Sequence, residues 1–116
     1  MPNTSGGSRP LYQVKADFFK ALGHPARIRI LEVLADGERS VKDIQPEVGL
    51  EASHLSQQLA VLRRAGFLQS RRDGAHVVYA LRDRRIARLL AVARTILLTS
   101  LTETRDLLTD LEEAHT

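Results

Sequence analysis

Two short helical patterns separated by a single glycine constrain the fold of this chain more than any other feature. Apolar residues at helical spacing predict a first helix that starts near Ser40 and ends at Gly49, because glycine suits a helix C-terminus. After a brief turn, a second apolar series predicts a helix over 52–65. The spaced apolar residues are Val41, Ile44, Val48, Leu55, Leu59 and Leu62. This arrangement is typical of a helix-turn-helix.

The side of the second helix away from its leucines offers donors and acceptors that fit the edges of DNA bases. A glutamine can bond adenine through two hydrogen bonds, and a serine can bond several bases. Arginines follow where the helix could meet phosphates. These polar residues are Ser53, His54, Ser56, Gln57, Gln58, Arg63 and Arg64. The alternative for this stretch alone is the solvated face of an ordinary helical bundle.

Positive charge is concentrated in the middle of the chain. The net charge of the 116 residues is only +3, but 63–88 carries eight arginines and two aspartates, a net +6. By contrast, 101–116 carries one arginine and five acidic residues, a net −4. A basic stretch beside a candidate reading helix is the electrostatic footprint expected of a nucleic-acid-binding protein.

Several classes of protein are excluded by what the sequence lacks. It has no cysteine, so thiolate metal sites and disulfides are excluded. No apolar run approaches the roughly 20 residues that span a membrane, and no signal-peptide core is present. We therefore expect a cytoplasmic protein without a membrane partner. Without a nucleophile elbow or a glycine-rich phosphate loop, we expect no enzyme, no catalytic residues and no cofactor.

Around the two helices, the sequence predicts one domain over 11–113. Residues 1–10 are rich in Gly, Ser and Pro, which indicates a flexible arm, and 114–116 form a short tail. An amphipathic helix is expected at 11–22, followed by a helix that begins at Pro25.

Beyond Gly66 the apolar period changes from that of a helix to that of strands. The β-prone segments on either side of Asp73-Gly74-Ala75 predict a hairpin over 67–81. Such a hairpin is marginal by itself, so it must pack against the helices. Its tip would direct charged side chains outward.

The last predicted helix, 83–113, contains no Gly or Pro and carries an apolar stripe along its length. A helix of about 45 Å is longer than a small domain is wide, so much of the stripe would stay wet in a monomer. Pairing with a second copy, beside the helix at 11–22, would bury it. We expect the dimer interface to include Leu11, Phe18, Leu90, Leu97, Leu101 and Leu108. A helix folded back on its own domain, or broken in two, is the alternative.

Three motifs in this order resemble those of the ArsR-type (arsenical-resistance repressor) winged-helix regulators. Residues 19–31 resemble the first motif of the family, and 56–68 resemble its recognition helix with the exit from that helix. Arg71-Arg72-Asp73-Gly74, together with Tyr79-Ala80-Leu81, resembles the wing. The resemblance covers about 11–111.

The resemblance implies a mainly α protein with a small β-hairpin: a winged helix-turn-helix of four helices, two strands and a last helix, dimerising through its first and last helices. It implies a homodimeric repressor that binds an inverted repeat in double-stranded DNA and is released by an inducer. The residues it places at bases are Ser53, His54, Ser56 and Gln57. Those it places at phosphates or in the minor groove are Arg63, Arg64, Arg71, Arg72 and His76.

The metal sites of the family are not implied here. Many relatives carry cysteines where this chain reads Arg39-Ser40-Val41-Lys42-Asp43, and others carry histidine ligands on the last helix, where this chain has only His115. We expect His24 to fix a helix junction through backbone bonds, and the histidines not to meet within one protomer. A small-molecule or metal inducer stays open, including a site at Glu112 and His115 with the partner's arm.

A reading from another class is a dimeric protein-interaction module. In it, the long last helix and its acidic end would dock a partner protein, and the winged domain would be a scaffold that reads no DNA. The basic stretch at 63–88 argues against this reading.

Overall fold

The computed structural model describes residues 9–114 of the chain. The expected arm at 1–10 therefore lies outside the described residues except for Arg9 and Pro10, and the tail lies outside them except for Ala114. The chain forms two compact units, Met1–Asp83 and Arg84–Thr116. Each is described by itself.

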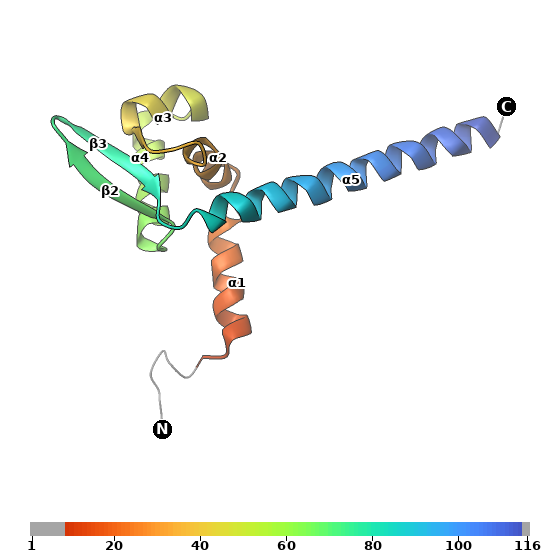
Figure 1. Ribbon diagram of the computed structural model, residues 1–116, viewed down its shortest axis with the longest axis horizontal. Helices are drawn as coiled ribbons and strands as arrows, with labels where there is room; N and C mark the ends of the chain where they lie inside the picture. Colours follow the sequence, from red (N-terminus) through yellow and green to blue (C-terminus); the bar gives the residue numbers. More distant parts are fainter. Residues whose placement is uncertain (1–8, 115–116) are drawn as a thin grey trace. The chain divides into compact units, whose positions relative to one another are not determined.

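The first unit contains four helices, of which α3 and α4 form the helix-turn-helix (Figure 1). The helices are α1 (Leu11–Leu22), α2 (Pro25–Leu34), α3 (Val41–Val48) and α4 (Ala52–Arg64). The Ser40 Oγ accepts a hydrogen bond from the Asp43 N–H at 3.2 Å and so caps α3, whose start near Ser40 the sequence predicts. Gly49 ends α3 at φ +76°, a left-handed conformation that favours glycine.

The core of the first unit is small and entirely apolar. It draws on the last residue of α1, on α2, α3 and α4, and on residues 67, 68 and 78 of the hairpin region. Among the described residues, no polar or charged side chain is buried. The buried residues are Leu22, Ile30, Leu31, Val33, Leu34, Ile44, Leu55, Leu59, Leu62, Phe67, Leu68 and Val78. The ring of Phe18 on α1 lies 5.0 Å from that of Phe67, which ties α1 to this core.

The sequence predicts a two-stranded hairpin, but the structure has a three-stranded antiparallel sheet that contains it. Its strands are β1 (Arg39–Ser40), β2 (Leu68–Asp73) and β3 (His76–Leu81), in the order β1-β3-β2. Gly74 is the first residue of the turn between β2 and β3 and has φ +62°. The two-residue hairpin turns need a positive φ at this position, which glycine adopts without strain. The sequence did not predict β1, because a strand of two residues is too short to show a period. In addition, its partner β3 lies far away in the sequence.

The second unit is one continuous helix, α5 (Arg85–Ala114), of 30 residues. It agrees with the predicted 83–113, and the alternative of a broken helix is wrong. Only Ile86 is buried in α5, and every residue from Ala91 to Ala114 is exposed in the single chain. Its exposed large apolar residues are Val92, Ile96, Leu97, Leu98, Leu101, Leu107, Leu108 and Leu111.

Candidate nucleic-acid interface

Helix α4 separates a buried apolar side from an exposed polar side. Leu55, Leu59 and Leu62 are no more than 1% exposed, so this row fixes how the helix is rotated against the core. The opposite row is exposed and consists of Ser53, Ser56, Gln57, Arg63 and Arg64, which we call the polar strip. The strip therefore presents hydroxyl, amide and guanidinium groups to the outside along more than two helical turns.

The start of α4 is held by local bonds. The Nε2 of Gln45 on α3 donates to the Leu50 carbonyl at 3.2 Å, which fixes the turn between α3 and α4. The Ser53 Oγ donates to the Glu51 Oε1 at 3.2 Å. The first serine of the polar strip is thus oriented by the turn that precedes it.

Two of the predicted polar residues on α4 lie outside the polar strip. Gln58 is half-buried, and its Oε1 is buried without a hydrogen-bond partner. His54 is also half-buried, and its ring stands edge-on to that of His24, with 6.4 Å between the centroids. The expectation that the histidines do not meet within one protomer is therefore wrong for this pair.

His24 has the backbone role that the sequence predicts. Its Nδ1 accepts a hydrogen bond from the Ala26 N–H at 3.2 Å, so it caps the start of α2 just before Pro25. Because the same imidazole contacts His54, the α1–α2 junction and the recognition helix meet at one pair of rings.

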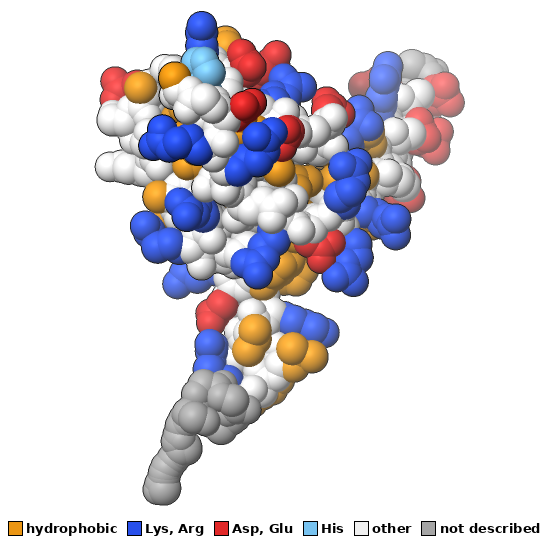
Figure 2. Space-filling model, turned by 60° about the vertical axis from the view of Figure 1, so that its left-hand side comes forward, with side chains coloured by type: hydrophobic (Ala, Val, Ile, Leu, Met, Phe, Trp, Pro, Cys, Tyr) orange, Lys and Arg blue, Asp and Glu red, His pale blue; other side chains and the backbone are white. Residues whose placement is uncertain are grey.

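The wing carries the other predicted basic residues, and all of them are exposed. Arg72 and His76 lie close to the tip of the β2–β3 hairpin, where Asp73 pairs with His76. Figure 2, in which the hairpin side of the molecule comes forward, shows Lys and Arg side chains spread over this face among fewer Asp and Glu. The face therefore suits a polyanion such as the DNA backbone.

Arg71 differs from the other wing arginines because it is already paired. Its Nη2 and Nε both donate to the carboxylate of Glu38, the latter at 3.4 Å, in a bidentate arrangement. Hydrogen bonding to Glu38 raises the pKa of Arg71, and the negative charge of Glu38 adds to this effect. Sequence reasoning missed this pair, because 33 residues separate its members and only β1 brings them together.

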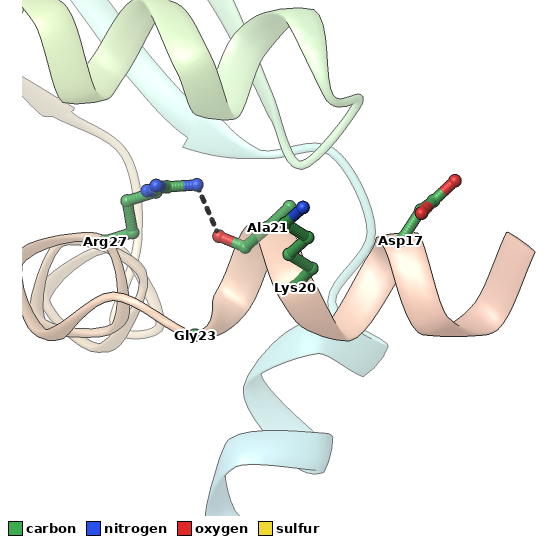
Figure 3. A pocket seen from close by; sticks show the side chains of 5 residues that line it. All are labelled: Asp17, Lys20, Ala21, Gly23 and Arg27. Atoms are coloured by element: carbon green, nitrogen blue, oxygen red, sulfur yellow. Dashed lines mark hydrogen bonds between the residues drawn. The ribbon is translucent and has the colours of Figure 1, made fainter.

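A hollow of about 520 Å³ lies at the α1–α2 junction (Figure 3). Its lining residues are Asp17, Lys20, Ala21, Gly23 and Arg27. The Arg27 Nη1 donates to the Ala21 carbonyl at 2.9 Å, and the carboxylate of Asp17 accepts a bond from Arg9 at 2.8 Å. Three of the five lining residues are charged, and two of these, Asp17 and Arg27, are already bonded within the chain.

Within residues 9–114, no three His, Asp or Glu side chains are grouped so that they could hold a metal ion. His115 and the arm lie outside the described residues, so a site that uses them is not tested. No helix in the described part of the chain is long and apolar enough to cross a membrane.

The helix-turn-helix, the polar strip and the basic wing together define a winged helix-turn-helix DNA-binding protein. Residues 24–70 match the model of the family described as "Bacterial regulatory protein, arsR family". Over 105 residues the chain is 54% identical to the HTH-type transcriptional regulator Rv0081 of Mycobacterium tuberculosis, covering 90% of this chain and 92% of that protein. The chain belongs to the ArsR family of transcriptional regulators, and the resemblance seen in its sequence is confirmed.

Solved structures agree with this assignment. The crystal structure of Rv0081 matches with a TM-score of 0.75 and 56% identity, over 83% of this chain and 97% of that one. The transcriptional repressor BigR from Xylella fastidiosa matches with a TM-score of 0.69 and 34% identity, over 73% and 87%. The homodimeric winged helix-turn-helix DNA-binding domain of Mb0332 from Mycobacterium bovis matches with a TM-score of 0.74 and 30% identity, over 89% and 95%. The predicted fold class is confirmed, and the chain is a DNA-binding regulator rather than an enzyme.

Proposed function

We propose that this protein is a homodimeric transcriptional repressor that binds an inverted-repeat operator in double-stranded DNA. Helix α4 enters the major groove, and the wing lies on the backbone or in the minor groove. The observation that carries the proposal is the polar strip: the rotation of α4 is fixed by buried leucines, and the exposed side carries base-reading and phosphate-binding groups.

Ser53, Ser56 and Gln57 are the proposed base readers, because they are exposed on the polar strip in the N-terminal half of α4. The N-terminal residues of a recognition helix are those that reach base edges in helix-turn-helix complexes. His54 stays a predicted reader from the resemblance alone, since its half-buried ring faces His24. Gln57 offers the two-bond geometry that distinguishes adenine.

Arg63, Arg64, Arg72 and His76 are the proposed backbone or minor-groove contacts. All four are exposed, and they lie on the C-terminal end of α4 and on the wing. Such contacts fix the register of the protein on DNA without reading sequence. They also predict binding that weakens steeply as salt concentration rises.

The proposed dimer uses apolar surface that the single chain leaves in water. Leu97 is 63% exposed and Leu101 66% exposed on α5, and Leu11 on α1 is 67% exposed. Phe18 is half-buried, and Leu90 is half-buried near the start of α5. Exposed apolar surface of this kind, on α5 and on α1, marks an interaction site, and the homodimeric state of the Mb0332 domain supports a second copy of this chain as its occupant.

The threonines of α5 are compatible with burial in such an interface. The hydroxyl of Thr104 donates to the Ser100 carbonyl at 3.0 Å, and that of Thr102 to the Leu98 carbonyl at 2.9 Å. Because these hydroxyls are bonded within their own helix, covering them leaves no donor without a partner.

In such a dimer, two α4 helices would enter successive major grooves about 34–36 Å apart, which requires a palindromic operator.

The proposed binding to DNA needs no cofactor, because side chains supply every donor and acceptor of the polar strip. We place the protein in the cytoplasm with the DNA that it regulates. An inducer, whether a small molecule or a metal ion, is not part of the proposal.

Selection of bound duplexes from fragmented genomic DNA, at near-physiological salt and with the purified protein, tests the proposal. We expect the sequenced fragments to share an imperfect palindrome with half-sites one helical turn apart. Recovery of unrelated fragments would reduce the function to charge-driven DNA affinity. Recovery of none would favour the protein-interaction module instead.

A further inference from the structure

The wing is tied to the helix-turn-helix by an ion pair that crosses the sheet. Ser40 on β1 pairs with Val78 on β3, and Val78 pairs with Arg71 on β2, so these three residues lie in one row on one face of the sheet. Glu38 lies two residues before Ser40. The Arg71 side chain therefore reaches across the middle strand to bind Glu38 beside the opposite outer strand.

The guanidinium group of Arg71 faces carboxylates on more than one side. Its Nε and Nη2 bind Glu38, and its Nη1 lies 4.0 Å from the Asp73 carboxylate. Hydrogen bonding to Glu38 also raises the pKa of Arg71. A DNA phosphate would have to displace Glu38 and would meet the charge of Asp73, whereas Arg72 points to the other face of β2.

The ion pair acts on the side of the sheet away from the direct connection between α4 and β2, where the short strand β1 joins the hairpin to α3. Strand β1 contributes only two residue pairs to the sheet, and its last residue, Ser40, is also the N-cap of α3. Val78, in the row between the two partners, is 8% exposed. Next to it lies a hollow of about 440 Å³ lined by residues of both elements, among them Glu38, Lys42 and Arg71. A link across this hollow restrains the angle between the wing and α3.

We propose that Arg71 and Glu38 are positioning residues that hold the wing at the angle at which Arg72 reaches DNA while α4 lies in the major groove, and that Arg71 does not contact DNA. This inference rests on the proposed function. It assigns to Arg71 a role different from the phosphate contact that the family resemblance implies.

Removal of the Glu38 charge changes operator affinity in opposite directions, depending on whether Arg71 contacts DNA or positions the wing. In Glu38→Gln, a DNA-contacting Arg71 would be freed and a negative charge near DNA removed, so operator affinity would rise. A positioning pair predicts the opposite: affinity falls, by at most about fivefold for an exposed ion pair. The matched control is Asp36→Asn, which removes a nearby charge that is 83% exposed and leaves Arg71 paired; its affinity should not fall.

The charge swap and the salt dependence give two further readouts. Arg71→Glu should weaken operator binding, and the double variant Glu38→Arg/Arg71→Glu should recover most of the loss. In Arg71→Ala, the slope of log K against log salt should match that of the wild type, whereas loss of one phosphate contact lowers its magnitude by about 0.9. A lower slope in Arg71→Ala, no recovery in the swap, or unchanged or raised affinity in Glu38→Gln overturns the inference.

Hydrogen exchange without DNA distinguishes failure of this inference from failure of the proposed function. In Glu38→Gln, the amides of β2 and β3 should exchange faster than in the wild type, while those of the α4 core exchange at wild-type rates. If the wing exchanges at the wild-type rate, the ion pair does not position it. If the wing loosens but the wild type selects no operator, the proposed function fails, although the ion pair still restrains the wing.

Discussion

The imidazole of His54 on the recognition helix stands edge-on to that of His24, at an interplanar angle of 79°. His24 also accepts the Ala26 N–H and so caps α2. The first turn of α4 is thus in contact with the cap of a neighbouring helix. Two substitutions at His24 separate its backbone bond from its ring contact.

We expect His24→Ala to lower the free energy of unfolding by about 1 kcal/mol, because the Ala26 N–H loses its acceptor. His24→Asn keeps an oxygen acceptor at the cap and removes the ring, so it should cost only a few tenths of that amount. Urea denaturation at 25 °C measures both. An asparagine variant as unstable as the alanine variant would show that the contact with His54, rather than the cap, is the important interaction.

Gln57→Ala should reduce the preference for the operator over a scrambled duplex by about 1–3 kcal/mol, since a bidentate contact with adenine would be lost. Affinity for the scrambled duplex should change little. Competition binding with the two duplexes measures the ratio. A uniform loss of affinity for both would remove Gln57 from the base readers.

Arg72→Ala should weaken binding to the operator and to the scrambled duplex by the same factor. The arginine is proposed to meet the backbone, where contacts carry no sequence information. The magnitude of the salt slope should also fall by about 0.9. The operator preference of this variant should stay at the wild-type value, and a change in that preference would show that Arg72 reads bases.

Leu97→Asp should convert the dimer into a monomer and weaken operator binding, because it places a charge in the apolar face of α5. Thr99→Asp is the matched control: Thr99 lies two residues on and projects from nearly the opposite side of the helix. Analytical ultracentrifugation of both variants measures the effect. Dimers in Leu97→Asp, or monomers in Thr99→Asp, would place the interface elsewhere.

The helices and the hairpin could be predicted because their signals are local. Gly49, the Ser40 cap and the leucine spacing of α4 each act within a few residues, and the bounds 52–65 and 83–113 lie close to the observed α4 and α5. The exposure of Ser53, Ser56 and Gln57 followed from the same spacing.

What the sequence did not show depends on contacts between segments far apart in the chain. Strand β1 forms only because β3 offers it an edge, and the pairing of Arg71 with Glu38 follows from that edge. The contact of His24 with His54 likewise depends on how α2 and α4 pack. Periodicity contains no information on such pairs, and a charged residue on a wing has the same pattern whether it faces DNA or a carboxylate.

Folding and the proposed recognition of DNA use opposite sides of α4. The three leucines that hold it, Leu55, Leu59 and Leu62, contribute nothing to the outer surface, and the side chains of Ser56 and Gln57 contribute nothing to the core. Operator choice can therefore diverge among descendants of one ancestral gene without loss of the scaffold. The same separation makes α4 suitable for engineering: new outward residues grafted onto the unchanged leucine row would redirect the protein to a different promoter.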